Sequence, residues 1–300
     1  MLNISIFQLI KQTLILWQGV VWQQIIRLTS IITLSENQWD KLDLLSILVK
    51  RDLETHYKGS ILGILWPLIK QLSQLLIYTY VFSVVLKVKL SDRGLSTGDA
   101  NFTFGLWLFA GLLPWLTFST GLTQAARVVL QQKNLVTKVV FPLELLPLVP
   151  ALSAFLESTF GLMALVTFSV FLNQSFHTTL LLLPLVWLPQ LLLTVGLSYL
   201  TAALTVFIRD IPQVLGIILN LWFYGTPILY PANLIPEPIQ TLVLWLNPLA
   251  AITAMHRDVV LIGTISHWQV WAVATVISAG ICSFGYWTYD KLRSAFADVL

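Results

Sequence analysis

Long apolar runs separated by short polar connections make up most of the chain. A transmembrane helix needs roughly 20 apolar residues to cross a hydrocarbon core about 30 Å thick. Six segments meet that length to within a few residues, so the pattern predicts an all-α membrane protein with six transmembrane helices. The predicted spans, which make one transmembrane domain over 61–300, are residues 61–86, 102–126, 143–172, 179–207, 213–230 and 268–289.

Two amphipathic segments precede the first predicted span. In residues 1–34, glutamines and basic residues interrupt the apolar positions at helical spacing, which predicts an N-terminal arm on the membrane surface. A peripheral extra span is the alternative, which Gln and Arg disfavour because they are costly at the bilayer centre. Ser35 and Gln38 predict a capping box that opens a second interfacial helix within residues 35–60.

A proline-rich segment lies between the fifth and sixth predicted spans. Residues 231–263 contain four prolines and one short apolar stretch, Ile239 to Leu246. This stretch is too short to cross a bilayer, and irregular backbone is not tolerated against lipid. We therefore predict a re-entrant or interfacial segment that is shielded by protein.

Composition and charge narrow the class of protein and its orientation. The chain is 57% hydrophobic and only 10% charged, which excludes a soluble globular protein. With the N-terminus inside, basic residues are concentrated on the inner side, and the positive-inside rule then predicts that both termini, and the helix within 35–60, are cytoplasmic. The formal net charge of +3 is too small to indicate a nucleic-acid partner. The basic residues left on the outside are Lys87, Lys89, Arg93 and Arg257.

No catalytic or nucleotide-binding motif is visible in the sequence. It contains no Gly-rich loop ending in Gly-Lys-Ser or Gly-Lys-Thr, and its four histidines are not at metal-ligand spacing. No Ser/His/Asp set is recognisable, and Cys282 as the single cysteine excludes an intrachain disulfide. We therefore expect no enzyme activity, cofactor or metal in this chain, and no ATP hydrolysis by this chain alone.

Four segments of the chain carry a family resemblance. They are LVKRDLETHYKGSILGILWP (48–67), KNLVTKVVFPLELLP (133–147), RDIPQVLGIILNLWFYGTPILYP (209–231) and the tail YDKLRSAFADVL (289–300). In order and spacing they resemble the permease subunits of ABC-2 type polysaccharide and teichoic-acid ABC exporters, over about residues 39–300. These permeases commonly begin near the helix of Trp39, so the arm at 1–34 is an addition that the resemblance does not explain.

The resemblance implies a function and a set of partners. It implies a homodimer of six-span subunits in the cytoplasmic (inner) membrane, driven by a separate ATP-binding subunit that holds ATP and Mg²⁺. The implied cargo is a lipid-linked polysaccharide on an undecaprenyl-type carrier, such as an O-antigen, a capsule or a teichoic-acid-like glycan. The alternatives are an ABC-2 permease for a small amphipathic drug or lipid, an ion-coupled carrier, which would need an internal repeat that we do not find, and a non-transporting scaffold.

The loop between the second and third predicted spans is the candidate contact with the ATP-binding subunit. A short helix there could lie in a groove of the ATPase and convert its closure into helix movement. A plain surface linker is the alternative. A second candidate contact precedes the fifth span, although Asp210 before Pro212 also fits an ordinary helix start. The candidate coupling residues are Lys133, Asn134, Lys138, Phe141, Arg209 and Asp210.

Basic residues gather where the chain leads into the first predicted span. Such a cluster attracts an anionic pyrophosphate headgroup by Coulomb attraction and charge-assisted hydrogen bonds. Arg51 is the strongest candidate because its planar guanidinium binds phosphate oxygens in pairs. Ordinary anchoring on anionic lipid is the alternative. The candidate headgroup residues are Lys50, Arg51, His56 and Lys58.

Aromatic side chains are dense in the second and fifth predicted spans. Their faces can stack on the C–H faces of sugar rings without requiring one order of sugars, which suits a conduit for a repeating polymer. An interfacial aromatic belt is the alternative. The candidate conduit residues are Phe104, Trp107, Trp115, Phe118, Trp222, Phe223 and Tyr224.

Three ionisable residues lie inside predicted spans, where charge is costly and commonly functional. Lys70 and Glu144 are within a few turns of the predicted cytoplasmic side, so they can snorkel or pair. Glu157 lies near the middle of the third span, and we expect it to face a partner helix or a wet cavity.

Overall fold

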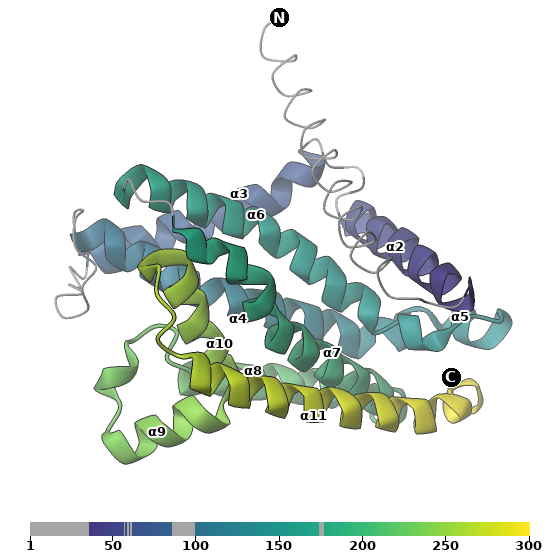
Figure 1. The fold of residues 1–300 in the computed structure, drawn as a ribbon. Helices are drawn as coiled ribbons and strands as arrows, with labels where there is room; N and C mark the ends of the chain where they lie inside the picture. The colour runs from purple at the N-terminus through teal and green to yellow at the C-terminus, as the bar shows by residue number, and fades with distance from the viewer. Residues whose placement is uncertain (1–35, 57, 59, 61, 86–99, 174–176) are drawn as a thin grey trace, which may run out of the picture.

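The computed structural model describes residues 36–300 except 57, 59, 61, 86–99 and 174–176, so the predicted arm at 1–34 lies outside it. Over the described residues the chain is helical and has no β-strand, as the sequence predicts (Figure 1). The longer helices are α2 (Glu36–His56), α3 (Trp66–Tyr78), α4 (Ala100–Gln131), α6 (Leu148–Asn173), α7 (Leu183–Phe207), α8 (Ile211–Gly225) and α11 (Trp268–Leu292).

Shorter helices and single turns connect these elements. The helices are α5 (Lys133–Lys138), α9 (Glu237–Leu246), α10 (Pro248–Arg257) and α12 (Phe296–Val299). The 3₁₀ and π segments are η1 (Gly63–Leu65), η2 (Thr79–Val85), η3 (Leu143–Leu145), η4 (Thr178–Leu182), η5 (Ala232–Leu234), η6 (Asp258–Ile262) and η7 (Arg293–Ala295).

Four helical stretches are long and apolar enough to cross a membrane: Phe104–Gln131, Leu143–Phe171, Thr178–Phe207 and Trp268–Val299. They correspond to the second, third, fourth and sixth predicted spans, which confirms a multi-pass membrane protein. The first predicted span is α3 continued by η2, and the fifth is α8, which has only 15 residues. The count of six spans therefore stays a prediction.

The proline-rich segment folds as two helices that meet at an angle of 90°. Asn247 makes the corner: its Oδ1 accepts a hydrogen bond from the Leu249 amide (3.1 Å) and caps α10. The same oxygen accepts from Trp222 Nε1 (3.0 Å), and the Asn247 amide donates to Thr226 Oγ1 (2.9 Å). The corner is thereby tied to α8, while the re-entrant or interfacial position of the pair stays a prediction.

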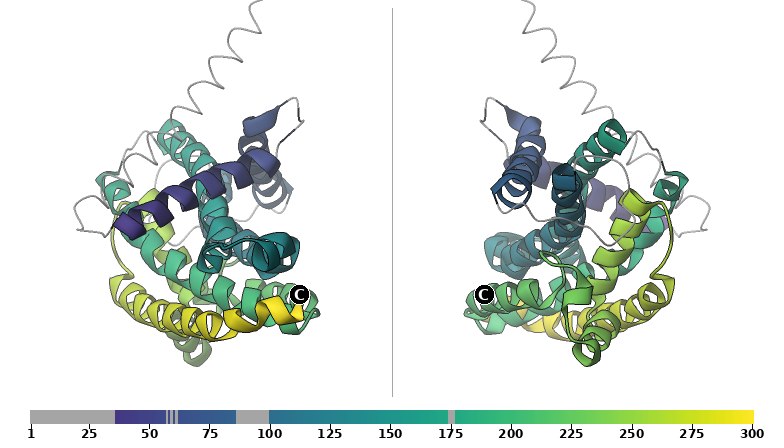
Figure 2. Two further views of the ribbon diagram at one scale, coloured as in Figure 1. Left: turned by 90° about the vertical axis from the view of Figure 1, so that its right-hand side faces the viewer. Right: turned by 90° about the vertical axis from the view of Figure 1, so that its left-hand side faces the viewer.

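The core lies around α4, which packs against α6, α7 and α10 and has most of its side chains buried. The closest helix pair is α7 with α11. A Cβ on Gly196 would lie 2.5 Å from the Cα of Cys282, so only glycine allows the two backbones to touch there. Figures 1 and 2 show α2 and α11 on opposite sides of the bundle, with α6 and α7 between them.

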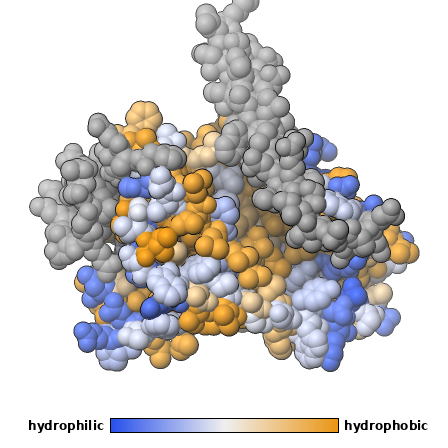
Figure 3. Space-filling model, viewed as in Figure 1, coloured by the Kyte–Doolittle hydropathy of each residue, from blue (hydrophilic) through white to orange (hydrophobic). Residues whose placement is uncertain are grey.

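One face of the molecule has hydrophobic and hydrophilic regions that are separate from each other (Figure 3). Figure 3 shows hydrophobic side chains filling the middle of one face, with hydrophilic residues gathered toward its right and lower-left ends. In Figure 1 the right-hand end carries α5, the start of α2 and the C-terminus. This end therefore gathers the segment that the sequence nominates for ATPase coupling, and we call it the coupling end.

Candidate functional site

The candidate coupling loop is an ordered, exposed helix. α5 begins directly after α4, and its Leu135 and Val136 pack against the apolar cluster formed by α4, α7 and α11. Lys133, Asn134 and Lys138 are exposed on its surface. This packing holds α5 against the bundle and leaves its polar side chains exposed.

Phe141 differs from the other candidate coupling residues. It is only partly exposed, and its ring packs against two apolar clusters, one around Tyr199 and one around Val49 of α2. Phe141 therefore holds the segment that contains α5 against the helix bundle. Arg209 and Asp210 are exposed in the turn between α7 and α8. The ring of Phe207, just before them, lies tilted against the ring of Phe296, with 6.1 Å between the centroids. That contact places them beside the C-terminal tail.

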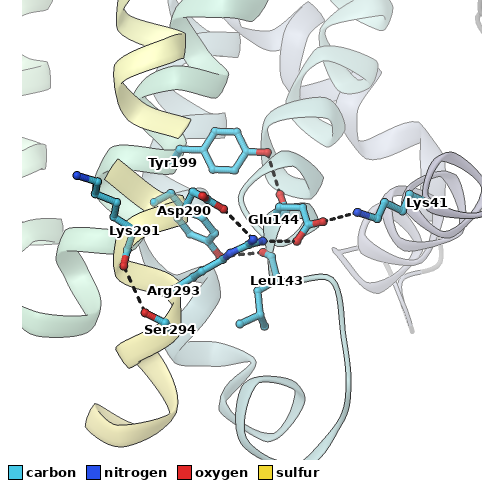
Figure 4. Close-up of polar contacts among 9 residues, drawn as sticks. Lys41, Leu143, Glu144, Tyr199, Asp290, Lys291, Arg293 and Ser294 are labelled. Carbon is cyan, nitrogen blue, oxygen red and sulfur yellow. Dashed lines mark hydrogen bonds and ion pairs between the residues drawn. The ribbon is translucent and has the colours of Figure 1, made fainter. Parts of the chain in front are cut away.

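Glu144 joins three elements at the base of α5 (Figure 4). Its Oε1 accepts a hydrogen bond from Lys41 Nζ of α2 (2.7 Å), and its Oε2 accepts from Arg293 Nη1 of η7 (2.9 Å). Arg293 also pairs with Asp290 on α11 (2.8 Å). The carboxylate is largely buried, so these charge-assisted bonds fix the start of α6 between α2 and the C-terminal end of α11.

Two tyrosines hold the backbone at the same place. Tyr199 of α7 donates to the Glu144 carbonyl (2.9 Å), and Tyr289 of α11 donates to the Leu143 carbonyl (2.8 Å). The Tyr289 ring packs edge-on against the fully buried Phe296 of α12 (5.4 Å between centroids). We call this set of contacts around Glu144 the Glu144 junction, because α2, α6, α7 and the C-terminal tail meet in it.

α2 lies along α6 from the Glu144 junction toward the middle of that helix. Its Leu45 and Val49 are buried against α6, and its last turn brings His56 Nδ1 to 4.0 Å from Glu157 Oε1. His56 and Asp52 are 3.9 Å apart (Nδ1 to Oδ2). Glu157 therefore faces a partner helix, as expected, and that partner is α2.

Lys50 and Arg51 lie on the exposed side of α2, Lys58 follows the helix, and His56 lies in its last turn beside Glu157. Lys50, Arg51, His56 and Lys58 are all exposed. Within the part of the chain that the structure describes, no carboxylate lies within ion-pairing distance of Lys50, Arg51 or Lys58. These three cations are therefore available for an anionic ligand.

The candidate conduit aromatics lie in two apolar clusters. Phe104 and Trp107 belong to one, and Trp115 and Phe118 pack against Trp222 and Phe223 of α8 in the other. Trp115 lies against Phe223 (5.3 Å between centroids), and Phe118 lies edge-on to Trp222 (5.4 Å). Trp222 and Phe223 are partly exposed, and Tyr224 is 61% exposed. Four aromatics of α4 are buried inside the subunit and pack against neighbouring side chains: Phe104, Trp107, Trp115 and Phe118.

A buried ionisable cluster at the other end of the bundle was not foreseen. Arg257, which the orientation argument counted among the outside basic residues, is only 6% exposed and stacks on Trp107 (3.5 Å to the ring centroid). It donates to the carbonyls of Trp107 (3.1 Å), Pro227 (2.9 Å) and Ile228 (2.7 Å). Three consecutive ionisable residues inside an otherwise apolar helix were the sequence signal for it.

Asp258 completes this buried cluster. It is 1% exposed, and its Oδ2 accepts from the amides of Ser266 (3.0 Å) and His267 (3.2 Å) at the start of α11. His267 Nδ1 lies 2.7 Å from the same oxygen. The cluster thus ties α10 to α4 and α11, and among the described residues no group of His, Cys, Asp and Glu is arranged to hold a metal ion.

Comparison with known proteins identifies the family of this chain. The ABC-2 type transporter family matches residues 43–261 of the chain. The chain is 33% identical over 217 residues to the O-antigen export system permease protein RfbA of Myxococcus xanthus, covering 72% of this chain and 79% of that protein. Its identity to an RfbA of Klebsiella pneumoniae is 29%, over 86% and 95% of the two chains. Its identity to the polysialic acid transport protein KpsM of Escherichia coli is 23%, over 72% and 80%. The chain belongs to the ABC-2 type transporter family.

Proposed function

We propose that this chain is the membrane-spanning subunit of an ATP-driven exporter that moves a lipid-linked polysaccharide across the cytoplasmic membrane. The relatives named for O-antigen export and polysialic acid transport support the cargo class. Within the structure, one observation supports the proposal: α5 is exposed and rests on the Glu144 junction. An ATP-binding subunit that docks on α5 would therefore contact a surface that is connected to the helix bundle. This chain acts as the permease, and a partner subunit binds ATP and Mg²⁺.

The coupling end transmits motion in this proposal. The partner ATPase binds Lys133, Asn134 and Lys138 on α5, with Arg209 and Asp210 as a second contact. ATP binding closes the partner and displaces α5, and ATP hydrolysis resets it. Because Glu144 holds Lys41 of α2 and Arg293 of η7 together, the displacement reaches α2 as well as the long helices.

The headgroup residues on α2 select the cargo. Lys50, Arg51 and Lys58 bind the pyrophosphate of the lipid carrier, and His56 joins them at the end of the helix. Arg51 makes the paired contact with phosphate oxygens. Since α2 is linked to the coupling end through Lys41, cargo binding and ATPase closure act on the same helix.

Two copies of the chain form the conduit. Both termini are cytoplasmic, and the polymer passes along α8, where Trp222, Phe223 and Tyr224 stack on sugar rings. The exposed apolar residues of α8 leave a surface for the second copy. Residues 1–34 serve as a membrane-surface arm, and residues 231–263 form a re-entrant or interfacial segment that is shielded by protein.

The test removes the chain from cells and follows the glycan. We expect the purified chain to copurify with an ATPase subunit, and its depletion to leave polyprenyl-linked glycan on the cytoplasmic side. Re-expression of the wild type should restore surface glycan, whereas a Lys133→Glu, Lys138→Glu variant should not. Val140→Thr, a neutral change beside the same helix, is the control. Normal surface glycan after depletion would contradict the proposal.

A further inference from the structure

A small polar pocket lies between α3, α4 and α6, beside the end of α2. Among its lining residues are Lys70, Gln71, Gln74, Thr117, Glu157 and Ser158. Glu157 connects it to the headgroup surface, because its Oε1 is 4.0 Å from His56 Nδ1 on α2. The pocket is therefore next to the place where the proposed function puts the pyrophosphate, although the proposed headgroup surface does not include it.

Two hydrogen-bond acceptors among the residues that line the pocket have no partner. Gln71 is only 8% exposed, and neither its Oε1 nor that of Gln74 has a hydrogen-bond partner. The hydroxyls of Thr117 and Ser158 donate to carbonyls of their own helices (2.9 and 2.7 Å), so their oxygens retain only acceptor capacity. Buried acceptors without partners are costly. The pocket therefore suits a ligand group that donates hydrogen bonds.

The size of the pocket and the charges that line it limit which hydrogen-bond donor of a ligand can bind there. The pocket has a volume of about 20 Å³, and a water needs roughly 10–15 Å³ on this measure, so one or two groups the size of water fit and a whole sugar ring does not. Lys70 and Glu157 both line the pocket, so one positive and one negative group face the ligand and neither sign of ligand charge is favoured. A neutral hydroxyl group fits both limits.

We propose that this pocket binds a hydroxyl group of the sugar that is attached directly to the pyrophosphate of the lipid-linked cargo. The inference rests on the proposed function, in which the basic residues of α2 hold that pyrophosphate. His56 lies 4.0 Å from Glu157, which lines the pocket, so a pyrophosphate held near His56 would place the first sugar next to Glu157, with a hydroxyl directed toward Gln71 and Gln74. The two glutamines then distinguish a glycosylated lipid from the bare lipid.

The test compares two probes on the purified complex of permease and ATPase in lipid nanodiscs. One probe is polyprenyl pyrophosphate, and the other is polyprenyl pyrophosphate bearing one N-acetylglucosamine. We expect wild type to prefer the glycosylated probe, and Gln71→Leu to lose about 3- to 10-fold in affinity for that probe alone, which is the effect of one neutral hydrogen bond. Gln213→Leu, an exposed glutamine on α8, is the matched control and should keep the preference.

Arg51→Gln separates this inference from the proposed function. Weaker binding of both probes supports the headgroup surface, whereas unchanged binding of both overturns that surface and the pocket inference with it. If Arg51→Gln weakens both probes and Gln71→Leu changes neither, or weakens both equally, the pocket inference alone is overturned. A Gln71→Leu effect only on binding of phosphatidylethanolamine would assign the pocket to an ammonium and overturn the hydroxyl. If Gln71→Leu does not assemble, the partly exposed Gln74→Leu serves with the same criteria.

Discussion

At the scale of single residues, Glu144 shows what a sequence can and cannot specify. Its position near the predicted cytoplasmic side indicated that it could snorkel or pair, and the structure shows that it pairs. The partners were not predictable, since Lys41 is 103 residues and Arg293 is 149 residues away along the chain. Only the packing of α2 and α11 against α6 brings them together.

We predict that Glu144→Gln weakens the Glu144 junction and uncouples the complex. The amide cannot accept two charge-assisted bonds, and because Lys41 and Arg293 are more than a third exposed, the loss of stability should be about 1 kcal/mol. The melting temperature of the purified chain should fall by about 2–4 °C, and ATP hydrolysis by the complex should respond less to cargo. Asp290→Asn removes only an exposed pair with Arg293 and should leave both measurements unchanged.

Arg257 supports a second prediction at this scale. Its guanidinium binds three backbone carbonyls from α4 and the segment after α8, and truncation removes the donor from those of Pro227 and Ile228, which lie outside any helix. Arg257→Ala should therefore destabilise the chain by at least about 3 kcal/mol, seen as loss of the monodisperse peak in size-exclusion chromatography. Arg257→Lys should be intermediate because an ammonium lacks the planar fork. A normal elution profile and melting curve for Arg257→Ala would refute this role; the exposed Arg209→Ala is the control.

At the scale of elements, the apolar pattern located four of the long helices but not how far each extends or where it bends: the sixth predicted span stops at residue 289, whereas the helical stretch continues to Val299. The fifth predicted span ran through residues 213–230, whereas α8 begins at Ile211 and ends at Gly225. Proline at the first turn and the Gly225–Thr226–Pro227 sequence set these limits locally. A hydropathy average along the sequence does not detect these helix limits, because the residues after Gly225 are apolar as well.

The contact of α7 with α11 gives a prediction about an element pair. Gly196→Ala would place a methyl group 2.5 Å from the Cys282 backbone, so the helices must separate and stability should fall by about 1–3 kcal/mol. Gly216→Ala on α8 is the matched control, since nothing lies within 4 Å of its added Cβ. It should gain up to about 1 kcal/mol through helix propensity. The check is the thermal unfolding of both variants; equal melting temperatures would contradict the close packing.

At the scale of the whole molecule, burial separates the aromatics that the sequence placed together. Density along the chain identified both groups, but neither spacing nor composition says which side of a helix faces the core. α4 is surrounded by α6, α7 and α10, so its aromatics are buried, whereas α8 lies at the outside with Tyr224 exposed. A conduit between two copies therefore has to be built from the outer helices.

The length of α8 indicates which outer surface the second copy covers. Its 15 residues span about 22 Å, less than the hydrocarbon thickness of about 30 Å, so a lipid-facing α8 would leave backbone ends against the bilayer. α11 belongs to a 32-residue helical stretch that is long and apolar enough to cross the membrane, so it can face lipid directly. Ile217 and Leu221 are exposed one turn apart on α8. Val276 is exposed on α11.

We predict that copies of the chain cross-link through α8 in the membrane. In a Cys282→Ser background, Ile217→Cys or Leu221→Cys should give a disulfide-linked dimer on mild oxidation, because this side of α8 faces the second copy. Val276→Cys, equally exposed but facing lipid, should stay monomeric on the same gel. Cross-linking through position 276 with none at 217 or 221 would move the dimer interface to α11 and would leave the exposed aromatics of α8 facing lipid, outside any conduit between the copies.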